Sequence, residues 1–165
     1  MPITTPNEEA MHSYREVTLT PTLDTNAYTA GDVLFDRTAI TPCWIKDCNL
    51  ELMQVQVLDT DDQAAAQMEL YFLDANQTLG TANAAPSVSD TNAAYIQGPL
   101  IIYSTDWIDL GGSKVARINP GSPGLPMLLS PVSDTATIYV AAITRGTPTH
   151  TASGLKFRFW FRDVR

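Results

Sequence analysis

The sequence has 165 residues, of which 44% are hydrophobic and 17% are charged, so it has enough length and apolar content for one compact domain with its own core. The formal net charge of −8 argues against a surface built to attract nucleic-acid phosphates, and we expect no nucleic-acid partner. The chain lacks any run near the ~18 apolar residues of a membrane helix, and its first residues lack the basic and apolar segments of a secretory signal. We therefore expect a soluble protein, made in a cytoplasm, without a membrane partner.

The first 13 residues are polar and include two prolines, Pro2 and Pro6. Asn7 could cap a short helix that begins at Glu8, but such a helix would be too short to cover a sheet. We therefore predict an extended N-terminal arm at residues 1–13 that becomes ordered on a partner, followed by a single domain at residues 14–165. The arm residues proposed to contact the partner are Asn7, Glu8 and His12.

In the rest of the chain the strongest periodic signal is a two-residue alternation of apolar and polar side chains, which is typical of strands with one buried face. It predicts about nine strands, at residues 15–20, 32–36, 38–45, 49–58, 67–74, 100–104, 113–118, 136–145 and 155–162. The last strand shows it best, because an apolar set alternates with a mostly basic set that consists of Lys156, Arg158, Trp160 and Arg162.

Turn-forming clusters of Gly, Pro, Asp and Asn separate these segments and leave room for little helix beyond one turn after Asp62, at residues 64–66. Many short strands joined by turns favour an all-β fold, an antiparallel β-sandwich, and the jelly roll is the most economical architecture of that class. The small and polar segments 80–94 and 119–126 are expected to form protrusions or contact loops.

The two cysteines, Cys43 and Cys48, are separated by four residues. This spacing is unusual for a redox pair, and a metal site would need two further ligands. We expect two buried or half-buried free thiols, because free cysteine is among the most buried residue types. A local disulfide and a catalytic thiol are the alternatives.

Catalytic motifs are missing from the sequence. The histidines, His12 and His150, are expected to be exposed loop residues, and no Gly-x-Ser-x-Gly elbow accompanies them. Neither a phosphate-binding loop nor a dinucleotide fingerprint occurs, so we expect no cofactor and no enzymatic activity.

Two further clusters allow more than one interpretation. The acidic run at residues 59–62 is expected to form a turn, with an ion site, for example for calcium, as the alternative. Trp44, Trp107 and Trp160 would suit a carbohydrate-binding sandwich if their rings were exposed, but Trp44 is expected to lie in the core.

Charge is distributed unevenly along the chain. Residues 145–165 contain five basic residues and one acidic residue, whereas the remainder is strongly acidic. A basic last strand on an acidic protein suits contact with an acidic protein surface, and a solvated face that discourages edge pairing is the alternative. The contact residues predicted here are Arg145, Lys156, Arg158, Trp160 and Arg162.

Residues 16–36, EVTLTPTLDTNAYTAGDVLFD, resemble the opening of small virion-associated proteins encoded by tailed bacteriophages. The run from Val140 to Thr151 shows the same likeness, which extends over most of residues 16–165. The resemblance rests on the general character of these segments and on their order along the chain, not on a diagnostic motif. The family that the chain resembles is that of the capsid cement, or decoration, proteins of short-tailed cyanophages and related podoviruses.

This resemblance implies a jelly-roll-like homotrimer on the outer surface of the virion capsid that ties subunits of the major capsid protein together. The protein would be synthesised in the host cytoplasm. The alternative function is that of a carbohydrate-binding β-sandwich module on a virion surface. No residue-level motif of the family can be carried over, so the contact residues above rest on physical arguments alone.

Overall fold

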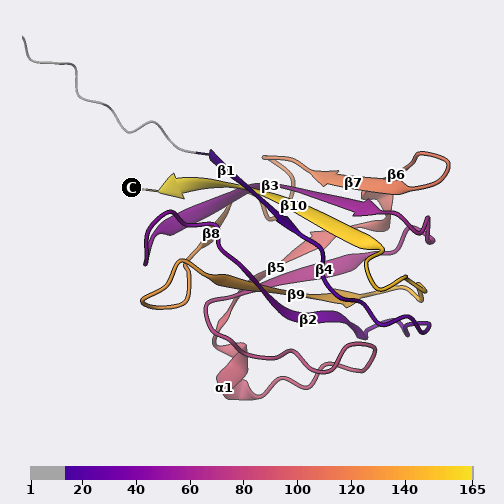
Figure 1. The fold of residues 1–165 in the computed structure, drawn as a ribbon, viewed down its shortest axis with the longest axis horizontal. Helices are drawn as coiled ribbons and strands as arrows, with labels where there is room; N and C mark the ends of the chain where they lie inside the picture. Colours follow the sequence, from indigo (N-terminus) through magenta and orange to yellow (C-terminus); the bar gives the residue numbers. More distant parts are fainter. Residues whose placement is uncertain (1–13, 165) are drawn as a thin grey trace, which may run out of the picture.

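The computed structural model describes residues 14–164, which fold into two antiparallel β-sheets packed face to face (Figure 1). The elements in chain order are β1 (Tyr14–Leu19), β2 (Val33–Ile40), β3 (Asn49–Asp59), β4 (Met68–Leu73), α1 (Asp90–Ala93), β5 (Ile96–Ile102), a 3₁₀ turn η1 (Ser104–Asp106), β6 (Trp107–Asp109), β7 (Lys114–Ile118), β8 (Met127–Leu129), β9 (Ile138–Thr144) and β10 (Leu155–Val164).

The strand order confirms the predicted jelly-roll-like sandwich. Sheet A has the order β1-β10-β3-β7-β6, with β8 also paired to β3, and sheet B has the order β2-β9-β4-β5. The first main strand therefore pairs with the last (β1 with β10), the second with the second last (β2 with β9), and so inward to β3 with β7 and β4 with β5. A long antiparallel hairpin wound so that successive pairs alternate between two sheets is a jelly roll.

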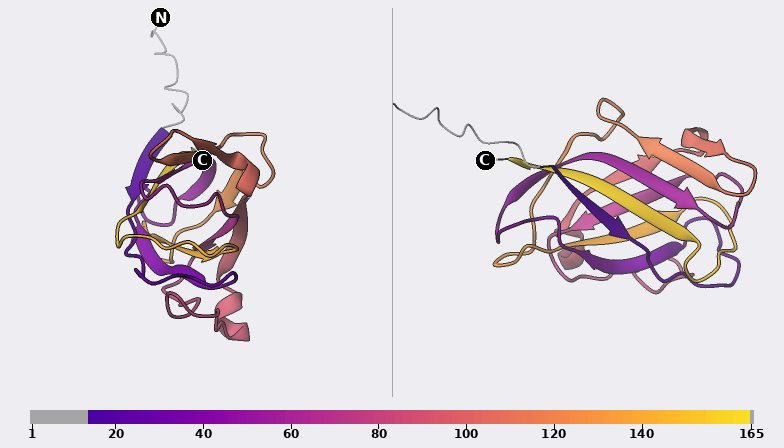
Figure 2. Two further views of the ribbon diagram at one scale, coloured as in Figure 1. Left: turned by 90° about the vertical axis from the view of Figure 1, so that its right-hand side faces the viewer. Right: turned by 45° about the horizontal axis from the view of Figure 1, so that its top comes forward.

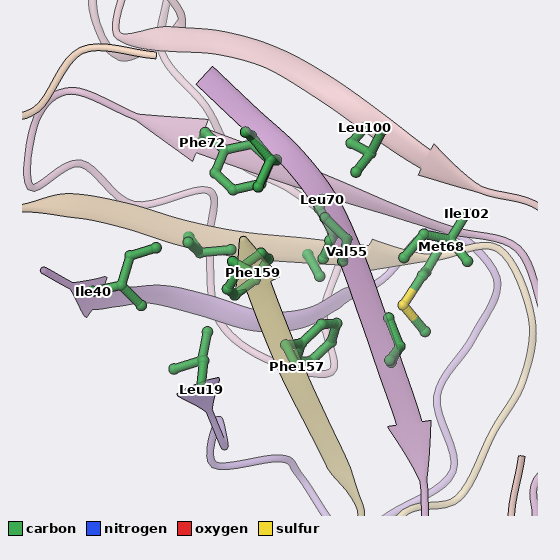
Figure 3. Packing of buried hydrophobic residues seen from close by; sticks show 14 of the residues in the cluster. Leu19, Ile40, Val55, Met68, Leu70, Phe72, Leu100, Ile102, Phe157 and Phe159 are labelled. Atoms are coloured by element: carbon green, nitrogen blue, oxygen red, sulfur yellow. The ribbon is translucent and has the colours of Figure 1, made fainter. Parts of the chain in front are cut away.

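The core lies between the sheets, and β10 contributes to it through alternate side chains. Phe157, Phe159 and Phe161 are fully buried, while the side chains between them face out of the sandwich. The rings of Phe157 and Phe159 meet aromatic rings of the opposite sheet. The ring centroids of Phe157 and Phe35 lie 5.4 Å apart, and those of Phe159 and Phe72 lie 5.9 Å apart. These contacts join strands that are far apart in sequence. Figure 3 shows Phe72, Phe157 and Phe159 among the buried side chains between the sheets.

A second, smaller apolar cluster lies on the outer face of sheet B, where Leu79 of the β4–β5 connection packs with Val33, Leu73, Ala141 and Ile143 of the strands. The connection from β4 to β5, with α1 in it, folds over this face below β2 in Figure 1, and both views of Figure 2 agree. Backbone hydrogen bonds hold it there, since the amide of Val33 donates to the carbonyl of Ala84. Residues 80–94 were predicted to form a protrusion or a contact loop, and the part around Ala84 is held against sheet B instead of protruding.

Other local predictions also need correction. The strands predicted at residues 32–36 and 38–45 form one strand, β2, which ends at Ile40, and β6 and β8 were not predicted. No helical turn forms at residues 64–66. Cys43 and Cys48 form a disulfide, so the prediction of two free thiols is wrong and its disulfide alternative holds. Within residues 14–164, no helix is long and apolar enough to cross a membrane.

Candidate interaction surface

The predicted contact residues of the last strand lie together on the outer face of sheet A. Lys156, Arg158, Trp160 and Arg162 alternate with the buried phenylalanines, so all four point away from the core. The strands on either side, β1 and β3, place Glu16 and other polar side chains in the same face.

These neighbours neutralise much of the basic charge. Arg162 donates from Nε to Oε2 of Glu51 at 2.9 Å and makes a second, closer bond from Nη2, and this pairing raises the pKa of the guanidinium. Nε of Arg158 lies 3.7 Å from Oε1 of Glu16. Arg162 lies directly opposite Glu51, whereas Glu16 lies diagonally from Arg158, and both positions allow side-chain pairing across adjacent antiparallel strands. The face predicted to be basic is therefore one of mixed charge.

Arg145 does not belong to this face. It follows β9 in sheet B and makes a two-point contact with Glu69 of β4, from Nε at 2.8 Å and from Nη2 at 2.7 Å. The Tyr71 hydroxyl donates to the same carboxylate at 2.7 Å. The guanidinium lowers the pKa of Glu69, while burial, followed by the bond to Glu69, raises the pKa of Tyr71 to about 12. Arg145 is close to β10 in sequence, but the two lie in different sheets, and sequence position does not reveal this.

The arm residues Asn7, Glu8 and His12 lie outside the described residues. They join the described domain at Tyr14, where β1 begins. Figures 1 and 2 show that β1 begins and β10 ends at the same end of the sandwich.

That end also gathers exposed apolar side chains, a feature that the sequence did not reveal. We call it the apolar end and define it by Tyr14, Trp44, Ile45, Leu128 and Val164, all of them large and exposed. The register places Tyr14 and Leu128 in one row across sheet A, on either side of the Arg162–Glu51 pair. Clusters of exposed apolar side chains on a folded domain mark contact sites.

The most exposed members lie in the loop that the disulfide closes. The side chains of Trp44 and Ile45 are 66% and 68% exposed, so the prediction that Trp44 lies in the core is wrong. The Arg15 guanidinium lies 4.5 Å above the indole and also donates to the carbonyl of Cys43 at 2.7 Å, which holds the loop against β1. A shallow pocket lined by Trp44, Ile45, Cys48, Asn49, Asp163 and Val164 lies beside it.

Apolar residues are also exposed at the other end. Ile108 of β6 and Leu110 just after it are each 62% exposed. Figure 1 shows β6 at the end of the molecule opposite the C-terminus. Like Trp44 and Ile45, these two residues are apolar and largely exposed, but they lie at the opposite end of the sandwich.

The predictions for His150 and for the acidic run have different outcomes. His150 is only 5% exposed, so it is not the exposed loop residue that the sequence suggested. The acidic run forms the predicted turn: the amides of Asp61 and Gln63 donate to the carboxylate of Asp59. The residues after β9 fold back onto this turn and thereby cover His150.

Comparison with known proteins gives little on function. No protein-family model matches the chain, and no curated protein sequence matches it significantly. Among solved structures, the chain is similar to one of tomato aspermy virus, with a TM-score of 0.46, 12% identity, and coverage of 94% of this chain and 79% of that one.

Two further likenesses are weaker. One is to a structure of infectious bursal disease virus, strain Gx, with a TM-score of 0.36, 13% identity, and coverage of 90% of this chain and 32% of that one. The other is to desmodium yellow mottle tymovirus, with a TM-score of 0.29, 10% identity, and coverage of 100% and 89%. The strand order of the chain itself defines the architecture.

Proposed function

We propose that this chain is a structural virion protein of the cement, or decoration, type, which binds the outer surface of a phage head as a homotrimer and ties subunits of the major capsid protein together without catalysis. The observation that carries the proposal is the apolar end, where five exposed apolar side chains lie next to the point at which residues 1–13 join the domain. If residues 1–13 form the predicted arm, the arm and the apolar end would extend one continuous contact area.

Two further features support a role in assembly. The jelly roll is an architecture that capsid domains share with lectins and cupins, so the fold allows the proposed role without requiring it. The mixed charges on the outer face of sheet A, with Glu16 and Glu51 beside Arg158 and Arg162, suit the polar rim of a protein interface.

A binding experiment with phage heads that lack this protein tests the proposal. We expect the wild-type chain to bind these shells and the double variant Trp44→Ser/Ile45→Ser to bind with much reduced occupancy. The matched control is Ile108→Ser/Leu110→Ser, which removes equally exposed apolar side chains from the opposite end and should leave occupancy unchanged. Bound protein is measured on sedimented shells, and circular dichroism verifies the fold of each variant.

The two pairs of substitutions make the outcome decisive. Equal binding by the wild type and the Trp44/Ile45 variant would contradict a contact at the apolar end. Loss of binding only in the Ile108/Leu110 variant would move the contact to β6. The proposed homotrimer would be contradicted if the free protein has a mass in solution other than that of a trimer and the bound protein is not arranged in groups of three on the shells.

A carbohydrate-binding module remains the second candidate, and the exposed indole of Trp44 favours it. Sugars stack on exposed aromatic rings, and Tyr14 also exposes an aromatic ring at the same end. Retention of the wild-type chain on a glycan column, lost in Trp44→Ala and kept in Ile108→Ser, would favour this candidate. Binding to protein shells stripped of glycans would favour the cement role.

A further inference from the structure

The connection from β3 to β4 and the connection from β9 to β10 meet at the end of the sandwich that carries β6. The amide of Thr60 donates to the carbonyl of Gly154 at 2.9 Å, and the amide of Thr149 donates to the side-chain oxygen of Gln63 at 3.0 Å. These bonds fix two loops from different parts of the sequence against each other.

His150 lies between these loops with a ring nitrogen that has no partner. The residue is 5% exposed, and its Nδ1 atom is buried without a hydrogen bond. This atom faces two carboxylates, at 3.5 Å from Oδ2 of Asp61 and 3.9 Å from Oδ1 of Asp59. A buried polar atom without a partner is costly and calls for an explanation.

The two carboxylates are already held in place by other donors. Asp59 accepts from the amides of Asp61 and Gln63 at 2.9 and 3.0 Å. Asp61 accepts from the amide of Thr151 at 2.7 Å and from its hydroxyl at 2.9 Å. A carboxylate offers about four lone-pair positions, so each retains acceptor capacity toward His150. Donors that orient carboxylates in this way are a typical outer shell of metal sites.

The spacing of the three side chains matches that of ligands around one ion. One ligand atom from each of Asp59, Asp61 and His150 can be chosen so that all three lie within 4.8 Å of one another. With metal–ligand bonds of about 2.0–2.2 Å, adjacent ligand atoms of a tetrahedral site lie about 3.3–3.6 Å apart. The separations to Nδ1 therefore need only small adjustments. We propose that Asp59, Asp61 and His150 bind a divalent transition-metal ion that joins the two loops.

The donor set favours zinc over calcium. Imidazole nitrogen together with carboxylate oxygen is a common ligand set of Zn²⁺, whereas Ca²⁺ takes six to eight oxygen atoms. A surface groove lined by Asp61, His150 and the neighbouring loop residues, among them Thr25 and Thr149, gives access for the ion and for water as a fourth ligand. The site uses none of the residues of the apolar end, so it can be tested separately from the proposed function.

Zinc binding to the full-length, tag-free chain tests the proposal. After the chain is treated with EDTA, we expect titration with Zn²⁺ to give one ion per chain by calorimetry and to raise the melting temperature by mass action. Added EDTA should reverse the rise. Substitution by Co²⁺ should give the visible absorption of a four-coordinate site, a readout that does not depend on stability.

Variants identify the ligands. His150→Gln should weaken zinc binding by more than about 100-fold, since even the loss of an outer-shell partner costs 10–100-fold. Asp61→Asn keeps an acceptor for Thr151 but loses the negative charge, so it should also weaken zinc binding. It serves as the second test if His150→Gln fails to fold. The matched controls are Asp62→Asn, whose carboxylate binds Lys114 instead, and His12→Gln; both should bind zinc like the wild type.

Three results would overturn the proposal. The first is no zinc binding by the wild-type chain, with a melting temperature that neither zinc nor EDTA changes. The second is zinc binding that His150→Gln leaves unchanged or that His12→Gln removes. The third is binding of Ca²⁺ but not Zn²⁺, which would make the cluster a site of oxygen ligands without a role for His150.

Discussion

Tyr71 is a partly buried side chain whose contribution to stability can be tested by changing the pH. Its pKa is raised to about 12, first by burial and then by the bond to Glu69, so the folded state favours the neutral phenol. A raised pKa contributes stability that is present below the ordinary value of 10.0 and is lost as the pH rises toward about 12.

We therefore expect the wild-type melting temperature to fall between pH 10.0 and about 12 more steeply than that of Tyr71→Phe, which has no phenol to ionise. Thermal melts followed by circular dichroism across this range provide the measurement. Tyr14→Phe, which removes an exposed phenol, is the control and should follow the wild type. Parallel curves for all three proteins would contradict the role of Tyr71.

Gly154 lies directly against the side chain of Asp61. A Cβ atom built there would lie 1.7 Å from Oδ2 of Asp61, far inside contact distance, so Asp61 or the loop would have to move. We expect Gly154→Ala to lower the free energy of unfolding by about 1–3 kcal/mol, as overpacking usually does.

Gly112→Ala is the matched control for that substitution, because nothing lies within 4 Å of its added Cβ atom. Urea unfolding of both variants gives the two free energies. A Gly154→Ala protein as stable as Gly112→Ala would show that the turn around Asp61 can yield.

At the scale of elements, β10 connects most of the molecule. It pairs with β1 on one side and β3 on the other, and its aromatic rings meet Phe35 and Phe72 of the opposite sheet. We expect Phe159→Ala to cost about 3–5 kcal/mol, because a fully buried ring leaves a cavity. Denaturant unfolding measures this cost, and Trp160→Ala, on the outer face of the same strand, should cost clearly less. Equal costs would mean that the strand is not anchored through its inner face.

The loop closed by the Cys43–Cys48 disulfide is the element that presents Trp44. A cross-link over so short a loop contributes about 2 kcal/mol in the chain-entropy model. We expect reduction by dithiothreitol to lower the melting temperature of the wild type and its occupancy on shells, but not to change those of Cys43→Ser/Cys48→Ser. A wild-type chain that responds to reductant no more than the double variant would contradict this role of the loop.

The strands could be predicted from the sequence where one face is buried and the other solvated, as in β10, because the alternation is then strict. β6 and β8 could not be predicted, since each has only three residues and too few positions to show a period. Pairing across long separations, such as β1 with β10, leaves no local trace in the sequence. For the same reason the salt bridges of Arg158 and Arg162, the exposure of Trp44 and the burial of His150 came only from the structure, whereas the Cys43–Cys48 disulfide was one of the alternatives that the sequence allowed.

At the scale of the whole molecule, residues 14–164 form both sheets and the core between them. We expect deletion of residues 1–13 to leave the melting temperature within about 2 °C of the wild type, because a free-energy change below 1 kcal/mol shifts it by no more than a few degrees. Occupancy on shells should nevertheless fall. Melts and sedimentation with shells give the two values, and an unfolded truncated chain would contradict the prediction.

The two outer faces of the sandwich differ because the β4–β5 connection covers sheet B, while the strands of sheet A present polar side chains directly (Figure 1). In a regular array whose contacts use the open face of sheet A, a copy turned over would present the loop-covered face of sheet B to its neighbours. Such a copy could not make the same contacts. The covering segment thus gives the molecule a distinct front and back, which fixes its orientation in any regular array that uses the open sheet.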